Sequence, residues 1–468
     1  MERCGAQGVS FVVSIILARL LAPEAYGVVA LIAVFTSILR VFIDSGFGSS
    51  LIQKKDADDL DFSTVFYFNM VMCLSLYGLL FLAAPLIARF YAMPELTPMV
   101  RVVGLSLIIS GVKGVQQSYV SKHLLFKRFF FATLGGTIGA AFVGIYMAYN
   151  GFGAWALIAQ SLFNNAVDTV ILWVTVKWRP KWMFSWQRLK GLFSYGWKLL
   201  VSSLLNTIYG DIRQLIIGKG YTAEDLAYYN KGNLFPNTVV TNINSSIDSV
   251  LLPTMAAEQN DKTRMKAMTR RAITVSTYVM MPMMMGLVVC AVPLTRLILT
   301  EKWLPSVLFM RIFCFSYAFQ AIHTANLNAI KAMGRSDLFL KLEVAKKIVG
   351  LAAVFATMFI SVEAMAYSVF FSTIASQIIN ASPNKKLLNY SYLEQIKDML
   401  PQIGLTCAMG AVVYCITFLN LSDIVTLLIQ VPLGAIIYVA GSWLFKIESF
   451  VYLLDMLKSF RAKKKVGN

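Results

Sequence analysis

Apolar runs of roughly 20 residues recur along the whole chain and are separated by short polar joints. A helix of about 20 residues crosses the roughly 30 Å hydrocarbon core of a bilayer. The runs lack the alternation over about 10 residues that is typical of barrel strands. The pattern therefore predicts an all-α polytopic membrane protein with spans at residues 5–22, 25–48, 63–88, 99–121, 129–149, 154–176, 191–217, 226–252, 272–298, 304–332, 338–360, 363–382, 396–418 and 422–445, which makes fourteen.

Composition agrees with this interpretation, because 57% of the 468 residues are hydrophobic and only 14% are charged. The first apolar run begins almost at Met1 without the cleavage site of a signal peptide, so we expect it to be a retained span. The chain has six cysteines without a C-x-x-C pair and only two histidines, so we expect neither a metal site nor a cofactor site. It contains no phosphate-binding loop, so we expect no ATPase motor. We expect the methionine run 280–285, with its proline, to serve in packing.

The net charge of +18 at first suggests a nucleic acid partner. The basic residues are instead sorted by topology. Joints after even-numbered spans are rich in Lys and Arg, whereas joints after odd-numbered spans carry few, with Arg89, Lys219 and Lys302 as exceptions. By the positive-inside rule both termini are cytoplasmic, and the charge needs no nucleic acid to explain it.

A short acidic corner occurs twice, as "LLAPEAYG" at 20–27 and as "GYTAEDLAYY" at 220–229. Each corner precedes a helix-length segment that ends in "IDS", which places Asp44 and Asp248 in corresponding positions. The corners fall between spans 1 and 2 and between spans 7 and 8. This spacing favours two six-span halves, an arrangement that is common in secondary transporters.

Polar residues recur every three or four positions in several spans, so they share one helix face. Span 8 carries Asn230, Asn233, Asn237, Thr241, Asn244 and Asp248, and span 7 carries Ser194, Lys198, Ser202, Asn206, Tyr209 and Arg213. The alternative is that such groups join helices by hydrogen bonds, and we favour that for Asn164, Asn165 and Asp168 of span 6. The long stripes favour a hydrated cavity, because a cation at membrane depth costs about 3 kcal/mol unless it is hydrated or paired.

Spans 1, 2 and 4 carry shorter polar faces of the same kind. Across spans 1, 2, 4, 7 and 8 the inward-facing charge is mainly cationic, with Arg3, Arg40, Lys113, Lys198, Arg213 and Lys231 against Asp44, Asp211 and Asp248. Such a cavity favours an anion: arginine suits phosphate, while asparagine and serine suit sugar hydroxyls. The candidate substrate-binding residues are Arg40, Lys113, Lys198, Asn206, Arg213, Lys231 and Asn237. Asp44 and Asp248 are candidates for ion coupling or for a salt-bridge latch, although Asp44 could also simply neutralise Arg40 one turn away.

Six stretches carry a resemblance to a known family: "ARLLAPEAYG" (18–27), "DSGFGSSLIQKK" (44–55), "STVFYFN" (63–69), "APLIARFY" (84–91), "GFGAWALIAQ" (151–160) and "KWRPKW" (177–182). The chain resembles the Wzx-like flippases of lipid-linked oligosaccharides in the multidrug, oligosaccharidyl-lipid and polysaccharide exporter superfamily, in the branch of lipopolysaccharide and colanic-acid exporters. The resemblance implies six-helix lobes at 1–180 and 181–388, with two extra helices and a basic tail at 389–468.

The same resemblance implies transport of an undecaprenyl-pyrophosphate-linked glycan from the cytoplasmic to the periplasmic leaflet of the inner membrane, by alternating access coupled to an ion gradient. No catalytic residues come with it. A polysaccharide polymerase and chain-length proteins are the partners it suggests, besides the lipid bilayer. One alternative is a multidrug exporter of the same superfamily. The other is a glycan polymerase or ligase, which would need a large outer loop, and every odd-numbered joint is short.

Overall fold

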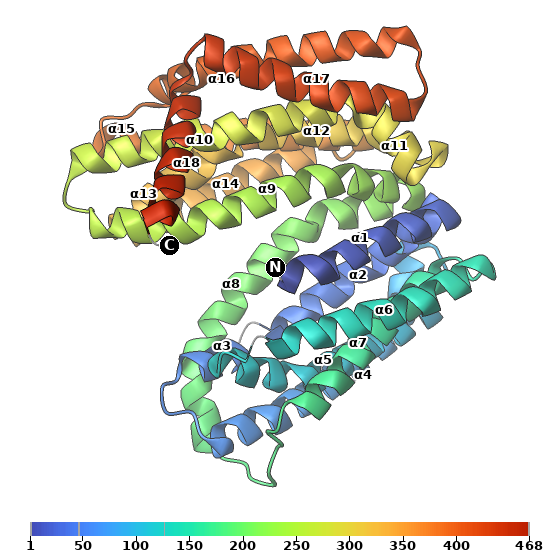
Figure 1. Cartoon of the computed structure of the whole chain (residues 1–468). Helices are drawn as coiled ribbons and strands as arrows, with labels where there is room; N and C mark the ends of the chain where they lie inside the picture. The colour runs from blue at the N-terminus through green and yellow to red at the C-terminus, as the bar shows by residue number, and fades with distance from the viewer. Residues whose placement is uncertain (1, 45–46, 126, 467–468) are drawn as a thin grey trace. The chain divides into compact units, whose positions relative to one another are not determined.

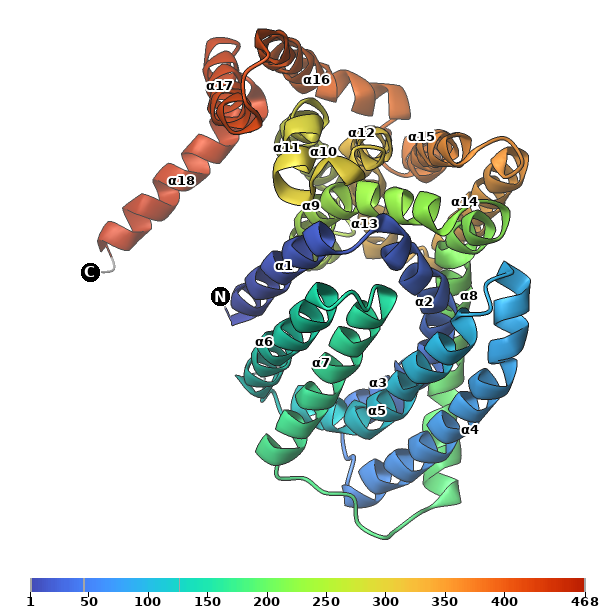
Figure 2. The same cartoon turned by 90° about the vertical axis from the view of Figure 1, so that its right-hand side faces the viewer.

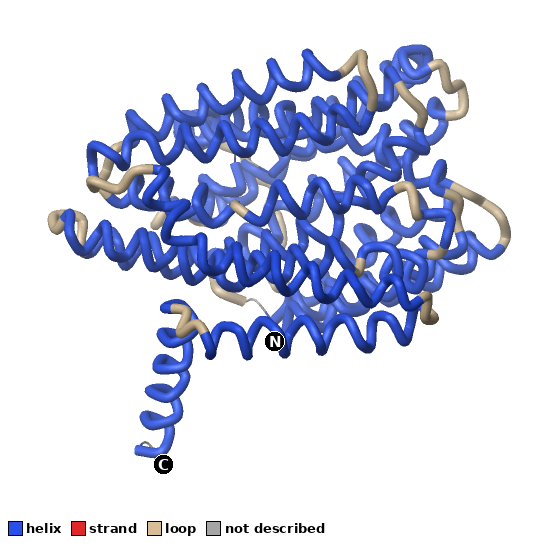
Figure 3. The backbone as a smooth tube through the Cα atoms, turned by 90° about the horizontal axis from the view of Figure 1, so that it is seen from above, coloured by secondary structure: helices blue, strands red, loops and turns tan. Residues whose placement is uncertain are grey.

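A computed structural model describes residues 2–44, 47–125 and 127–466. Within these residues the chain consists of helices and short loops, with no strand (Figure 3). Nine helical segments of the described chain are long and apolar enough to cross a membrane, and Gly8–Leu20 and Thr133–Tyr149 are shorter apolar helices. The protein is therefore an all-α, multi-pass membrane protein, as the sequence predicts. It divides into two compact units, Met1–Ala227 and Tyr228–Asn468.

The first unit holds eight helices in its described residues and the beginning of a ninth (Figure 1). They are α1 (Glu2–Leu20), α2 (Pro23–Asp44), α3 (Phe47–Gln53), α4 (Asp59–Tyr91), α5 (Leu96–Lys122), α6 (Lys127–Tyr149), α7 (Ala154–Thr175) and α8 (Trp186–Gly220). Helix α4 lies beside α5, and α6 lies beside α7, so each pair forms a helical hairpin (Figure 2). Glycines permit this: a Cβ at Gly111 of α5 would lie 2.5 Å from the sulfur of Cys73 in α4.

The second unit contains most of α9 (Ala223–Ala257) and the remaining helices. These are α10 (Lys262–Val289), α11 (Ala291–Leu299), the short 3-10 helix η1 (Glu301–Trp303), α12 (Ser306–Ala318), α13 (Gln320–Ala332), α14 (Ser336–Thr357), α15 (Val362–Leu387), α16 (Tyr392–Cys415), η2 (Ile416–Leu419), α17 (Asp423–Leu444) and α18 (Glu448–Val466). Met280, Met281 and Met284 are buried in a cluster with Val240 and Met310, so this part of the methionine run packs in the core.

Each predicted span coincides with one helix or with two consecutive helices. The prediction of one continuous helix over 272–298 is wrong, because the chain breaks at Cys290. Pro293 has no backbone N–H and cannot donate the helical hydrogen bond to the carbonyl of Val289, which is the last residue of α10. Span 304–332 also breaks, at Phe319, which packs against two buried clusters. The short helix α3 was not predicted.

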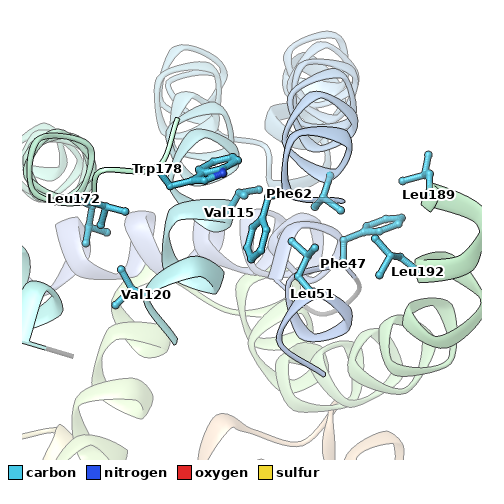
Figure 4. Close-up of a cluster of buried hydrophobic side chains, with 11 residues drawn as sticks. Phe47, Leu51, Phe62, Val115, Val120, Leu172, Trp178, Leu189 and Leu192 are labelled. Atoms are coloured by element: carbon cyan, nitrogen blue, oxygen red, sulfur yellow. The ribbon is translucent and has the colours of Figure 1, made fainter. Parts of the chain in front are cut away.

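A buried cluster in the first unit draws residues from five helices and from the segment that follows α7 (Figure 4). It comprises Phe47, Leu51, Phe62, Val65, Val115, Val120, Leu172, Val176, Trp178, Leu189 and Leu192. Phe47 and Leu51 lie one turn apart on α3, which explains why this short segment folds as a helix against the core. Leu189 and Leu192 join the first turns of α8 to the same core. The division into lobes at residue 180 remains a prediction about the repeat.

The two acidic corners that mark the repeat lie against each other. A Cβ at Gly27 of α2 would stand 1.7 Å from the carbonyl oxygen of Ala223, the first residue of α9. Further along, a Cβ at Gly218 of α8 would stand 2.1 Å from a methyl of Leu31. Only glycine permits approaches this close, so these two residues set the distance between α2 and the chain that leads from α8 into α9.

Candidate anion-binding site

The helices α2 and α8 run antiparallel, because Leu31 faces Gly218 while Ser37, later in α2, faces Asp211, earlier in α8. The hydroxyl of Ser37 donates a hydrogen bond of 2.5 Å to Oδ2 of Asp211. Gln214 donates to Oδ1 of the same carboxylate at 3.3 Å. This contact determines the register in which the polar stripes of the two helices meet.

Arg40 and Arg213 lie on either side of the Ser37–Asp211 contact. Arg40 is three residues beyond Ser37 and Arg213 two residues beyond Asp211, so the five residues of helical rise separate them by about 7.5 Å along the antiparallel axes. Both side chains are half-buried. The Nε atoms of both are buried and have no hydrogen-bond partner among the described residues. Within that part of the chain neither guanidinium forms an ion pair; the carboxylate of Asp211 lies between the two arginines, and the side chain of Asp44, one turn beyond Arg40, lies outside the described residues.

Lys198 and Asn206 continue the α8 stripe toward the start of the helix, and both are exposed. Asn206 is seven residues from Arg213, about 10 Å along the helix axis. Lys198 is fifteen residues away, about 22 Å, which is farther than one headgroup reaches. If these residues bind substrate, Lys198 contacts a different part of it from Arg213.

Lys113 of α5 has a partner in this conformation. Its Nζ lies 2.8 Å from Oδ2 of Asp168 in α7, and the side chains are only 12% and 16% exposed. The sequence suggested a helix-joining role for Asp168 and a substrate role for Lys113, without connecting the two. Their separation of 55 positions hides the pair from any pattern along one helix.

The remaining candidates belong to the second unit. Lys231 is 8% exposed, and its Nζ lies 5.3 Å from the centre of the Trp303 ring, in the range of a cation–π contact. Asn237 is exposed, and its Oδ1 accepts a 3.5 Å hydrogen bond from Thr241. Asp248 accepts a 2.6 Å hydrogen bond from the amide of Asn328. The side chains of Asp44 and Arg3 lie outside the described residues.

Sequence reasoning missed a buried amide network that joins α13, α15 and α16. Nδ2 of Asn384 donates to Oδ1 of Asn326 at 2.6 Å, and Nε2 of Gln395 donates to the same oxygen at 3.0 Å. All three side chains are fully buried. Beside them Nδ2 of Asn380 lies 2.7 Å from Nδ1 of His323. The spacing of Asn380 and Asn384, one turn apart, was a signal that could have indicated this face.

Comparison with known proteins places residues 16–308 in a family described as polysaccharide biosynthesis protein. The chain is 25% identical over 308 residues to the teichuronic acid biosynthesis protein TuaB of Bacillus subtilis (strain 168). It is 26% identical over 307 residues to the succinoglycan biosynthesis transport protein ExoT of Rhizobium meliloti (strain 1021). Each match covers 65% of this chain, and 63% and 61% of TuaB and ExoT, so the chain spans less than two thirds of these relatives.

Among solved structures, the fold is similar to that of the lipid II flippase MurJ in an inward closed conformation. The TM-score is 0.77 over 95% of this chain and 97% of MurJ, at 14% sequence identity. The TM-score shows a shared fold, and an identity this low shows nothing more than the fold. It leaves the ligand to be argued from the residues of this chain.

Proposed function

The chain belongs to the polysaccharide biosynthesis protein family, and we propose that it moves an undecaprenyl-pyrophosphate-linked oligosaccharide from the cytoplasmic to the periplasmic leaflet of the inner membrane. The similarity to ExoT, a transport protein, and the fold shared with MurJ, a flippase, support a transporter. The product would serve the synthesis of a surface polysaccharide such as lipopolysaccharide O-antigen, colanic acid or another exopolysaccharide. In this proposal the protein is not an enzyme.

The observation that carries the proposal is the pair Arg40 and Arg213. Two half-buried guanidinium groups that form no ion pair with a described carboxylate, and whose Nε atoms have no described hydrogen-bond partner, favour binding of an anion. A guanidinium presents a planar fork of donors that matches two oxygens of one phosphate. Two such forks about 7.5 Å apart along the helices suit a diphosphate better than an uncharged glycan. Asn206, two turns from Arg213 on α8, has a side-chain amide that can form hydrogen bonds with the hydroxyl groups of the first sugar.

The transport mechanism we propose is alternating access, in which the diphosphate is held by the two arginines while the cavity opens first to one side and then to the other. Both termini are cytoplasmic in this arrangement, as the distribution of Lys and Arg predicts. A polysaccharide polymerase and chain-length proteins would then receive the glycan on the periplasmic side. No contact with nucleic acid is required.

The test is flipping of a fluorescent lipid-linked oligosaccharide by purified protein in vesicles. The double variant Arg40→Gln, Arg213→Gln should lower the initial rate at least tenfold, because hydrogen bonds to charged groups contribute about 1.5–3 kcal/mol each. Arg40→Lys, Arg213→Lys keeps the charge but loses the fork, so its rate should be intermediate. Arg89→Gln removes an exposed arginine at the end of α4 and is the matched control.

Normal flipping by the double glutamine variant would remove the arginine site. Elongation or transfer of glycan without movement between leaflets would contradict the transporter and support the polymerase or ligase. Drug efflux with no effect on the lipid-linked glycan would support the multidrug exporter. Normal export by the variant Arg213→Ala, Lys198→Ala would exclude the α8 stripe as a substrate path.

Coupling to an ion gradient is assigned in this proposal to Asp44 and Asp248. Asp248 is exposed yet held by the buried Asn328, so its carboxylate has a defined position. Asp248→Asn should depress flipping in vesicles and change its response to an imposed pH or sodium gradient. Asn328→Ala, which frees the carboxylate but keeps its charge, should retain that response. Flipping by the unmodified protein without any gradient would leave only a latch role for these carboxylates.

A further inference from the structure

A polar cavity of about 440 Å³ lies in the first unit between the end of α3 and the first two turns of α8. Arg188, which lines it, is 25 residues from Arg213 on the same helix, about 37 Å along the axis. The cavity is therefore separate from the arginine pair. Its lining includes Lys54 and Arg188 together with the side-chain amides of Gln53 and Gln187.

The side chains of Lys54 and Arg188 both bind the buried carboxylate of Asp61. Asp61 is fully buried, and its Oδ2 accepts from Nζ of Lys54 at 2.6 Å and from Arg188 at 3.5 Å. Arg188 also lies 3.5 Å from Asp58. Both cations line the cavity, whereas Asp58 and Asp61 do not. Asp61 thus fixes the positions of Lys54 and Arg188 at the cavity wall.

A third cation strengthens the positive field at this place. Nζ of Lys122 donates to the carbonyl oxygens of Leu51 and Lys54 at the end of α3. Lys54, Lys122 and Arg188 then stand against Asp58 and Asp61, which leaves one net positive charge in this group. An ammonium, a guanidinium fork and two amides around one space form a donor set that suits a phosphate.

An apolar cavity of about 570 Å³ lies where α8 begins. Trp182, Phe184 and Trp186 line that cavity together with Tyr67 of α4, whose ring stacks on Trp182 with centres 5.5 Å apart. Trp182 is 96% exposed, and clusters of exposed Trp and Tyr mark the level of the headgroups. Trp186 faces the apolar cavity, and the next two residues, Gln187 and Arg188, face the polar one.

We propose that the polar cavity binds the phosphate of a membrane lipid while its chain lies along the aromatic cavity, on the predicted cytoplasmic side. A phosphate-type donor set and an exposed aromatic surface at the same end of α8 are what select a lipid over a free anion. The phosphate could belong to an anionic phospholipid or to an isoprenoid phosphate. Only the isoprenoid arm of the test rests on the proposed function.

The experiment measures lipid binding to the full-length protein in detergent by native mass spectrometry, with phosphatidylglycerol, phosphatidylcholine, undecaprenyl phosphate and inorganic pyrophosphate as probes. Gln187 is exposed and lies outside the Asp61 ion pairs, so changing it should leave the fold intact. Gln187→Glu should weaken binding of phosphatidylglycerol about tenfold, and Gln187→Lys should tighten it. Lys190→Gln changes the net charge by the same amount as Gln187→Glu from a position that does not line the cavity, and it should bind normally.

Equal weakening by Gln187→Glu and Lys190→Gln would overturn the proposal, because it would show unspecific attraction. So would equal binding of phosphatidylcholine, or binding of inorganic pyrophosphate as tight as that of the lipids. Displacement of phosphatidylglycerol by equimolar undecaprenyl phosphate supports the site and assigns it to the isoprenoid. Retention of phosphatidylglycerol supports it and assigns it to a phospholipid. Flipping is not measured, so failure here leaves the transport proposal intact.

Discussion

Replacing Gly27 with alanine tests the contact between the two corners. The added Cβ would lie 1.7 Å from the carbonyl oxygen of Ala223 and 2.4 Å from its carbonyl carbon. Real Cβ atoms do not come closer than 3.0 Å, so α2 and the start of α9 must separate by at least 3.0 − 1.7 = 1.3 Å. No rotamer can relieve the clash, because the obstructing atoms belong to the backbone. Leu31, which is 1% exposed, would lose part of its packing as α2 moves.

Overpacking of a core typically costs 1–3 kcal/mol, and a backbone clash belongs at the upper end, so we expect a loss of about 3 kcal/mol. For a unit of roughly 200 residues this corresponds to a thermal midpoint lower by about 6 to 12 °C. The assay is the monodisperse fraction that remains after heating in detergent, measured by size-exclusion chromatography. Gly218→Ala should cost less, because its obstacle at 2.1 Å is a methyl of Leu31 that can rotate.

Gly78→Ala is the matched control, because no atom lies within 4 Å of a Cβ added there in the middle of α4. Its midpoint should match that of the unmodified protein or exceed it slightly, since alanine favours helix more than glycine does. If Gly27→Ala were as stable as Gly78→Ala, the two corners would not be in contact. The packing argument for the repeat would then fail.

Two further predictions concern charged groups of the first unit. Lys113→Met should destabilise the protein by about 3 kcal/mol, because it leaves Asp168 unpaired at membrane depth. The double variant Lys113→Met, Asp168→Leu should recover most of that loss in the same heating assay. If the double variant is stable but no longer flips the substrate, Lys113 belongs to the substrate site instead. The backbone N–H of Asp61 donates to Asp58 and holds the pKa of the Asp58 carboxyl below its usual range. The stability from this charge is therefore fully present above the unfolded pKa of about 3.9 and is lost as pH falls through the lower, folded value. The gap in thermal midpoint between the unmodified protein and Asp58→Asn should therefore begin to narrow below about pH 4. A gap that does not narrow at all as the pH is lowered from there would contradict the charge effect.

The sequence alone determined the helical class, the approximate limits of most helices and the polar stripes of α8 and α9, but not the breaks inside 272–298 and 304–332. These follow from hydropathy and from the 3.6-residue period, which are properties of residues near one another in the chain. The resemblance of short stretches such as 18–27 and 151–160 indicated the family, which the match over residues 16–308 confirms. The substrate role of the seven candidate residues stays a prediction.

Only the tertiary structure decided which charges are neutralised. Lys113 and Arg40 look alike as cations in apolar spans, yet Lys113 meets Asp168 from another helix, whereas Arg40 has no ion-pair partner in the described chain. The register of α2 on α8 likewise depends on the contact of Ser37 with Asp211, two residues that lie 174 positions apart. Pairing across such distances depends on the three-dimensional packing of whole helices, because local periodicity carries no information about which faces meet.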